Sequence, residues 1–181
     1  MNDVIKKLTP EQALEVLMRL NDKGDAIREA VVAEANNVLR GIGLDDVADD
    51  VFCVLDLIDV QECWTRSGRS RDGYTSPEDA AVELIEEILQ PYFIQAGHYH
   101  ELGMAEVEAT YCKGVILGIY RYQHESKSEF RDWAADIPIE CAGSLLSDWR
   151  ERSRNSNSAR AMDEFIRERC PKWAKQLLRK K

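Results

Sequence analysis

The chain has 181 residues, of which 44% are hydrophobic and 31% are charged, and its formal net charge is −9. This length suits one well-buried core, and the composition is that of a globular protein, which excludes wholesale disorder. No segment approaches the roughly 18 to 20 uninterrupted apolar residues of a membrane span. The amino terminus also lacks a signal-peptide pattern. We therefore expect a soluble, cytoplasmic protein without a membrane partner.

The five cysteines are widely scattered and form no CxC or CxxC pair. Structural zinc sites and disulfide scaffolds usually show close cysteine pairs. We therefore expect reduced cysteines that pack as small hydrophobic groups, with neither a metal nor another cofactor. The five are Cys53, Cys63, Cys112, Cys141 and Cys170.

Charge is distributed unevenly along the chain. Residues 1–65 hold 14 acids and 6 bases, a net charge of −8, whereas residues 160–181 hold 8 bases and 3 acids, a net charge of +5. The acidic part repels nucleic acid, but the basic tail from Arg160 to Lys181 is able to attract it. The alternative is that this tail packs on the acidic body of its own chain or of a sister chain.

Helical periodicity begins at Thr9, which precedes Pro10 and stands three residues before Gln12. This is the pattern of a capping box with proline at the first helical position. The first helix is predicted to end near Asn21 to Gly24 and to bury Leu14, Leu17 and Met18. A second helix is predicted from Asp25 to about Gly41, with one apolar stripe made by Ile27, Val31, Ala35, Val38 and Leu39.

A third, acid-rich helix is predicted to start at Asp45 or Asp46, and a polar loop over residues 66–75 follows it. Ser76 and Pro77 restart a helix by the same capping pattern. Because proline disrupts a helix interior, Pro91 is predicted to begin a new short helix that ends at Gly103.

The segment from 104 to about 124 is predicted to be one long buried helix. Gly114 and Gly118 lie on one face of it and would let a neighbouring helix approach closely. Further helices are predicted from residues 128, 136, 158 and 171. The polar composition of residues 152–158 is typical of a linker. We therefore expect a helical domain over residues 1–153 and a basic helical extension over residues 154–181.

These elements predict an all-α fold, an irregular array of about nine packed antiparallel helices. The joining of helix pairs at small residues, as at Leu102–Gly103–Met104, is typical of TPR- or HEAT-like helical repeats. The sequence has no clean period of 34 or 40 residues.

The run from Cys63 to Tyr74 (CWTRSGRSRDGY), together with residues 117–122 (LGIYRY), is similar to uncharacterised helical regions of proteins that carry a SWIM-type zinc finger. The resemblance covers roughly Leu44 to Trp149. That finger needs a CxC pair followed by CxH, and this chain has neither. The resemblance therefore implies a helical partner module without zinc and without known catalytic residues.

The loop over residues 66–75 is the main candidate site. Its arginines stand among glycines and serines, where guanidinium groups and backbone amides can converge on a phosphate or an acidic partner. Flanking aromatic residues could stack on a base. The structural alternative is that the arginines pair with carboxylates such as Asp56, Asp59 or Asp72. The candidate residues are Trp64, Arg66, Arg69, Arg71 and Tyr74.

Two other groups offer ligands for a metal ion. His98 and Glu101 are three residues apart and share a helical face, and the acids of the third helix are spaced by four. Surface histidines and a solvated acidic face are the favoured interpretations, so a metal-dependent hydrolase is the least favoured function. The acids are Asp45, Asp46, Asp49 and Asp50.

The pattern thus favours a non-enzymatic scaffold that binds a protein or a polyanion. The alternative is a nucleic-acid accessory protein that uses the arginine loop and the basic tail. Homo-oligomer formation is compatible with both.

Overall fold

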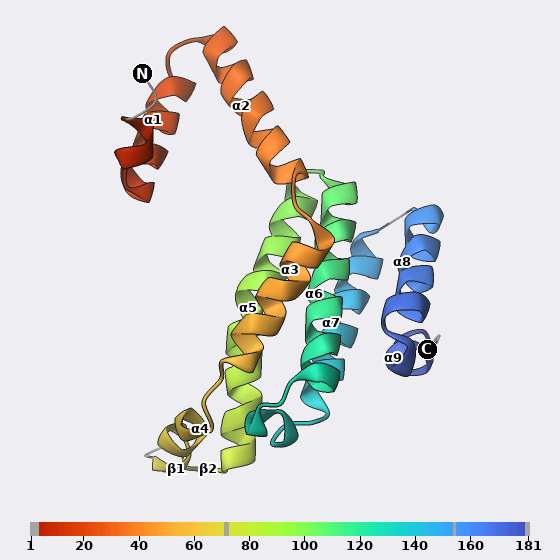
Figure 1. The fold of residues 1–181 in the computed structure, drawn as a ribbon. Coiled ribbons are helices and arrows are strands. Elements are labelled where there is room, and N and C mark those ends of the chain that lie inside the picture. Colours follow the sequence, from red (N-terminus) through yellow and green to blue (C-terminus); the bar gives the residue numbers. More distant parts are fainter. Residues whose placement is uncertain (1–3, 71–72, 154, 180–181) are drawn as a thin grey trace. The chain divides into compact units, whose positions relative to one another are not determined.

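The computed structural model describes residues 4–70, 73–153 and 155–179. Within these residues the chain is almost entirely helical, with nine α-helices, two short 3₁₀ helices and one two-stranded antiparallel sheet (Figure 1). The all-α prediction is confirmed at this level. No described helix is both long enough and apolar enough to cross a lipid bilayer.

The chain divides into two compact units, residues 1–41 and residues 42–181. The predicted boundary at 153/154 falls inside the second unit. There, the two helices of the basic extension pack on preceding helices, α8 (Ser156–Arg169) on α6 (Ala105–Glu125) and α9 (Pro171–Leu177) on α7 (Ile137–Arg152).

The first unit is a helical hairpin. It contains the 3₁₀ helix η1 (Ile5–Lys7), α1 (Pro10–Asn21) and α2 (Asp25–Arg40). The predicted capping box is confirmed, because the Thr9 hydroxyl accepts a hydrogen bond from the Gln12 backbone and the Gln12 side chain accepts one from the Thr9 backbone. Gly24 starts α2 with a φ of 124°, a conformation that disfavours other residues.

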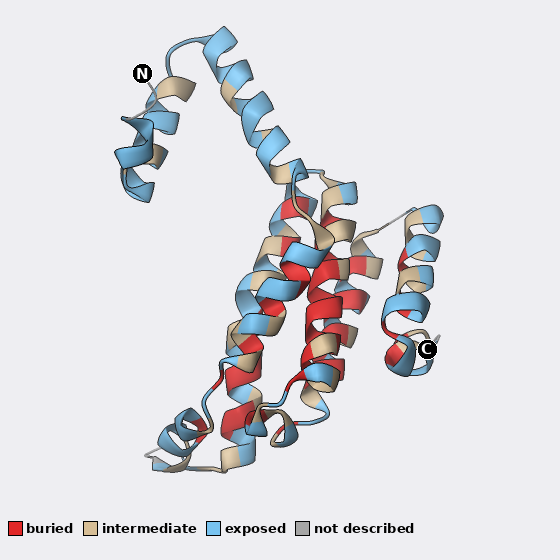
Figure 2. Cartoon of the chain, in the orientation of Figure 1, coloured by how far each residue is buried: buried red, intermediate tan, exposed pale blue. Residues whose placement is uncertain are grey.

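The predicted burial of the first helix is wrong. Leu14, Leu17 and Met18 are 60%, 49% and 63% exposed, and none of the described residues of α1 or α2 is buried (Figure 2). Periodicity identified the apolar face correctly, but two helices of this unit alone provide no third layer to cover it. Burying one such side chain stabilises a protein by about 1.5–3 kcal/mol.

The second unit is built around the contact between α3 (Leu44–Asp56) and α6, which lies at the centre of its buried residues (Figure 2). A Cβ atom at Gly114 would lie 2.7 Å from the Leu44 carbonyl oxygen and from the Val47 Cβ. One at Gly118 would lie 2.7 Å from the Ala48 carbonyl oxygen and from the Val51 Cβ. The predicted close approach is confirmed.

The helix α5 (Pro77–Glu101) runs through Pro91 without a break, so the predicted new helix at this position is wrong. Pro91 is exposed, so the carbonyl that loses its hydrogen-bond donor can face water. On the opposite side, Leu89 and Ala96 are fully buried, and this packing holds the two halves in line. Ser76 and Asp79 form the expected capping box at the start of α5. Gly103 follows the C-cap residue of this helix and has a φ of 70°.

The remaining elements of the second unit that precede α5 or α7 are short. Asp59 caps α4 (Val60–Arg66), and the strands β1 (Gly68–Ser70) and β2 (Gly73–Thr75) follow. Residues 128–133 form only the 3₁₀ helix η2 (Glu129–Asp132), in which Phe130 is fully buried.

We predict that Gly118→Ala lowers the free energy of unfolding by about 1–3 kcal/mol, because the added methyl group overlaps the backbone of α3. The loss occurs although alanine favours helix by about 1 kcal/mol over glycine. Gly97→Ala in α5 is the matched control, since no atom lies within 4 Å of its added Cβ. Urea unfolding followed by circular dichroism measures both. Equal stabilisation by the two substitutions would contradict the close α3–α6 contact.

Candidate functional site

The predicted arginine loop is a β-hairpin. Strands β1 and β2 are antiparallel, and Arg69 lies directly opposite Tyr74 in their register. Residues directly opposite in an antiparallel pair project from the same face of the ribbon. Arg69 and Tyr74 are therefore neighbours on one face, whereas Arg71 lies outside the described residues.

Arg66 is not available to an external anion in the way that the sequence suggested. Its Nη2 donates to Glu62 at 2.8 Å, and its Nη1 donates to Glu87 of α5. The hydrogen bond with Glu87, followed by that with Glu62, raises the pKa of Arg66. These partners differ from the carboxylates that the sequence suggested. Asp56 accepts a hydrogen bond from Ser126, Asp59 caps α4, and Asp72 lies outside the described residues. Arg66 thus anchors the hairpin region to α5.

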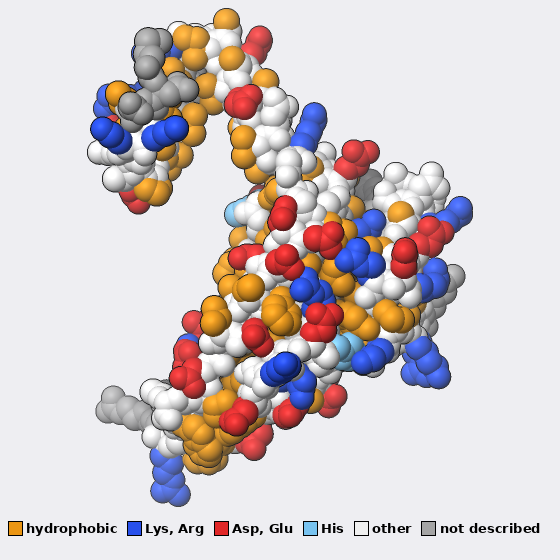
Figure 3. Space-filling model, viewed as in Figure 1, with side chains coloured by type: hydrophobic (Ala, Val, Ile, Leu, Met, Phe, Trp, Pro, Cys, Tyr) orange, Lys and Arg blue, Asp and Glu red, His pale blue; other side chains and the backbone are white. Residues whose placement is uncertain are grey.

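Arg69, by contrast, is exposed and makes no ion pair with any residue that the structure describes. Tyr74 is 68% exposed and Trp64 is 53% exposed. Trp64 meets Trp133 edge to face, with 5.4 Å between the ring centroids. Hydrophobic side chains gather at the end of the second unit where α4 and the hairpin lie (Figure 3). We call Trp64, Arg69 and Tyr74 the α4–hairpin surface.

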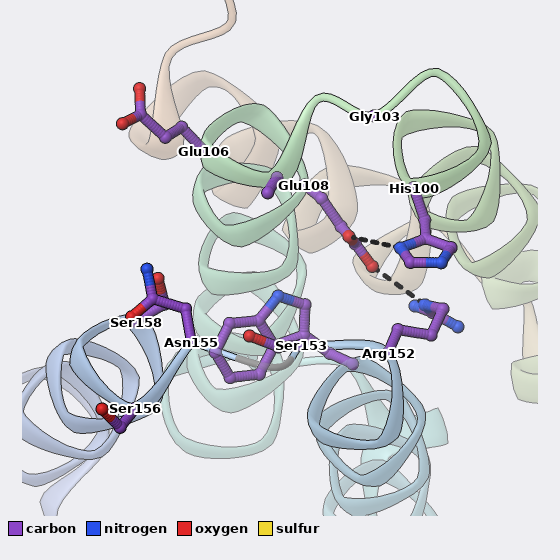
Figure 4. A pocket seen from close by; sticks show the side chains of 11 residues that line it. His100, Gly103, Glu106, Glu108, Arg152, Ser153, Asn155, Ser156 and Ser158 are labelled. Atoms are coloured by element: carbon purple, nitrogen blue, oxygen red, sulfur yellow. Dashed lines mark hydrogen bonds and ion pairs between the residues drawn. The ribbon is translucent and has the colours of Figure 1, made fainter.

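A polar pocket of about 760 Å³ lies among the ends of α5, α6, α7 and α8 (Figure 4). Glu108 is its central charged group and is only 3% exposed. Figure 4 shows its carboxylate pointing toward His100 and Arg152, whereas Glu106 points away. One carboxylate oxygen accepts a hydrogen bond from Arg152 Nε at 2.9 Å, and the other lies 3.4 Å from His100 Nδ1.

This arrangement ties three helices together, since His100 lies in the last turn of α5, Glu108 lies in the first turn of α6 and Arg152 ends α7. Each oxygen of Glu108 thus contacts a basic side chain of another helix. Glu108 was missed at the sequence level. The periodicity of the sequence could have indicated that Glu108 is buried. It stands three, four and seven residues before Tyr111, Cys112 and Val115, on the buried stripe of α6.

The two candidate metal sites do not assemble among the described residues, where no three or more His, Cys, Asp or Glu side chains converge. His98 is exposed and His100 faces Glu108. The acids of α3 instead bond separate partners, which join α3 to neighbouring helices. Asp45 pairs with Arg169 of α8, Asp49 pairs with Arg121 of α6, and Asp50 accepts a hydrogen bond from Tyr92 of α5.

The basic tail is partly neutralised within its own unit. Arg169 pairs with Asp45 at 2.9 Å, and Arg167 lies 4.0 Å from Asp163. Asp163 also joins the tail to α7, because it accepts a hydrogen bond from Arg150 at 2.7 Å. Trp173 is buried against Tyr120. In its described part the tail therefore packs on its own chain, which was the alternative to nucleic-acid binding.

Comparison with family models, with curated proteins and with solved structures found no match for this chain. The resemblance to helical regions of SWIM-type zinc-finger proteins therefore stays a prediction.

We predict that Glu108→Gln lowers the free energy of unfolding by about 3 kcal/mol, because Arg152 loses its counter-charge in a largely buried position. The double replacement Glu108→Leu with Arg152→Met should recover most of this loss, since it removes both charges. Asp49→Asn is the control, because it breaks an exposed pair worth about 1 kcal/mol or less. A loss for Glu108→Gln no larger than the control would contradict the structural role of the buried carboxylate.

Cysteine reactivity should separate one thiol from four. All five cysteines are free, Cys53 is exposed and the others are buried. Burial raises the pKa of Cys112 and of Cys170 to about 12, and that of Cys141 to about 11. At pH 8 in native buffer, a thiol reagent such as Ellman's reagent should react rapidly with Cys53 alone. In urea all five should react, and equally fast native labelling of Cys112 would contradict the buried core.

Proposed function

We propose that this chain is a non-enzymatic helical interaction module that binds a protein partner at the α4–hairpin surface. The observation that carries the proposal is the exposure of Tyr74 opposite Arg69, an arginine with no carboxylate partner among the described residues, together with the exposure of Trp64 on the preceding helix α4. Tryptophan, tyrosine and arginine are the residue types that dominate the binding energy of protein interfaces.

The chemistry of the surface indicates what its partner should present. Arg69 can hold a carboxylate of the partner through two parallel hydrogen bonds. The exposed rings of Trp64 and Tyr74 call for an apolar side chain beside that carboxylate. Because Arg66 is neutralised by two glutamates, the surface carries less positive charge than a phosphate-binding site would use. An acidic and apolar peptide segment therefore suits it better than a polyanion.

We also propose that the helix pairs stack in the manner of TPR or HEAT repeats. The support for this stacking is the tight turn at Gly103 between α5 and α6, together with the packing of α7 on α6. Modules of this kind commonly bind partner proteins.

Site-specific photo-crosslinking tests the proposed interface. Benzoylphenylalanine placed at Tyr74 of the full chain in its native cells should give a discrete adduct with one protein. The same crosslinker at Glu164, an exposed residue of α8, should not give this adduct. Arg69→Ala should reduce the adduct strongly, whereas Arg160→Ala, another exposed arginine, should leave it unchanged. An adduct that is equally strong in the Arg69→Ala variant would refute the assignment.

Nucleic-acid binding is the second candidate, since the exposed ring of Tyr74 beside Arg69 could stack on a base. Fluorescence anisotropy with labelled single- and double-stranded oligonucleotides separates the two functions. Binding that weakens steeply with salt and is lost on replacing Arg69 and Arg71 by alanine would favour nucleic acid, because counterion release drives such binding. We expect no binding at either low or physiological salt.

A further inference from the structure

We propose that a second copy of this chain covers the apolar face of the α1–α2 hairpin, so that two hairpins form a four-helix bundle. This inference is independent of the α4–hairpin surface. The face surrounds a hollow of about 750 Å³, and we call it the α1–α2 face. Its main lining residues are Leu17, Ile27, Val31, Glu34, Val38 and Leu39.

The α1–α2 face has no cover in its own unit. Val38 is 68% exposed, Leu17 is 49% exposed and Ile27 is 39% exposed. Hydrophobic side chains gather on the facing sides of the two helices (Figure 3). Helices of 12 and 16 residues are marginal in water unless tertiary packing covers their apolar stripe. The hairpin is therefore half of a packed structure.

The distribution of charge favours a second copy as the missing half. Residues 1–41 hold 7 acids and 6 bases, a net charge of −1, whereas residues 42–181 hold 26 acids and 18 bases, a net charge of −8. Two chains that met through their second units would repel each other strongly, but two hairpins meet with little repulsion. A strongly basic partner would likewise be drawn to the second unit rather than to the hairpin.

Two pairs of opposite charges are satisfied within each hairpin. Arg19 pairs with Glu15 and Arg28 pairs with Asp25, so neither pair needs a complementary charge from a partner. Among the residues that the structure describes, Glu34 is the one charged residue that lines the hollow, and the Asn37 side chain donates a hydrogen bond to it at 3.4 Å. Apart from Glu34, the described lining residues are apolar, which an identical face matches.

The pattern of the stripe is also self-complementary. Ile27, Val31, Ala35 and Val38 follow the spacing of three and four residues that lines the core of helical bundles. An identical hairpin supplies helices of the same length and the same spacing. A twofold axis then places each apolar stripe against its own copy, as in most homodimers.

Light scattering coupled to size exclusion, on the full chain over a range of concentrations, tests the proposal. We expect about twice the 20.7 kDa mass of one chain at about 100 μM protein. Val38→Glu should raise the dimer dissociation constant at least about tenfold, because it places a charge in the interface. Ala33→Glu is the matched control, since Ala33 is exposed on the same helix and does not line the hollow.

Circular dichroism should show that both variants keep their helices, because both positions are exposed. The proposal holds if the native chain and Ala33→Glu are dimers while Val38→Glu dissociates. A native chain that stays monomeric at this concentration overturns it, and would point to cover by the second unit or by another protein. A dimer that survives Val38→Glu also overturns it, because the contact would then lie elsewhere.

Discussion

The close contact between α3 and α6 at Gly114 and Gly118 is the constraint on which the second unit depends. The absence of two side chains lets backbone carbonyl oxygens of α3 lie 2.7 Å from the positions that Cβ atoms would take. This proximity brings the acids of α3 within reach of Arg121 and Arg169. Residues distant in the sequence are thus joined by ion pairs that a wider helix separation would break.

The sequence predicted those features whose causes are local. The capping boxes at Thr9 and Ser76 were identified because their residues lie within one helical turn. The glycine pair of α6 was identified because its spacing of four places both residues on one face. The predicted helix break at Pro91 was wrong, because packing on the other side of α5 outweighs the tendency of proline to end a helix. The sequence alone does not show this packing.

In the candidate site, too, the sequence predicted the local features and missed those that depend on tertiary contacts. The sequence located the exposed aromatic and arginine residues of the hairpin, since composition and a polar run mark such a segment. It did not distinguish Arg66 from Arg69, because the difference rests on Glu87, which is 21 residues away and on another helix. Glu108 escaped for a related reason. Its partners Arg152 and His100 come from α7 and α5, and only the tertiary structure makes a buried charge tolerable there.

The helix α5 links the hairpin end of the second unit to the pocket end. Glu87 holds Arg66 at one point, and His100, 13 residues later, meets Glu108 about 20 Å away along the axis. Pro91 stands between them, where the helix lacks one backbone hydrogen bond. The packing of Leu89 and Ala96, both fully buried on the opposite side, keeps α5 continuous across this gap. The separation between the hairpin end and the pocket end is therefore fixed by tertiary contacts as well as by the hydrogen bonds of the helix itself.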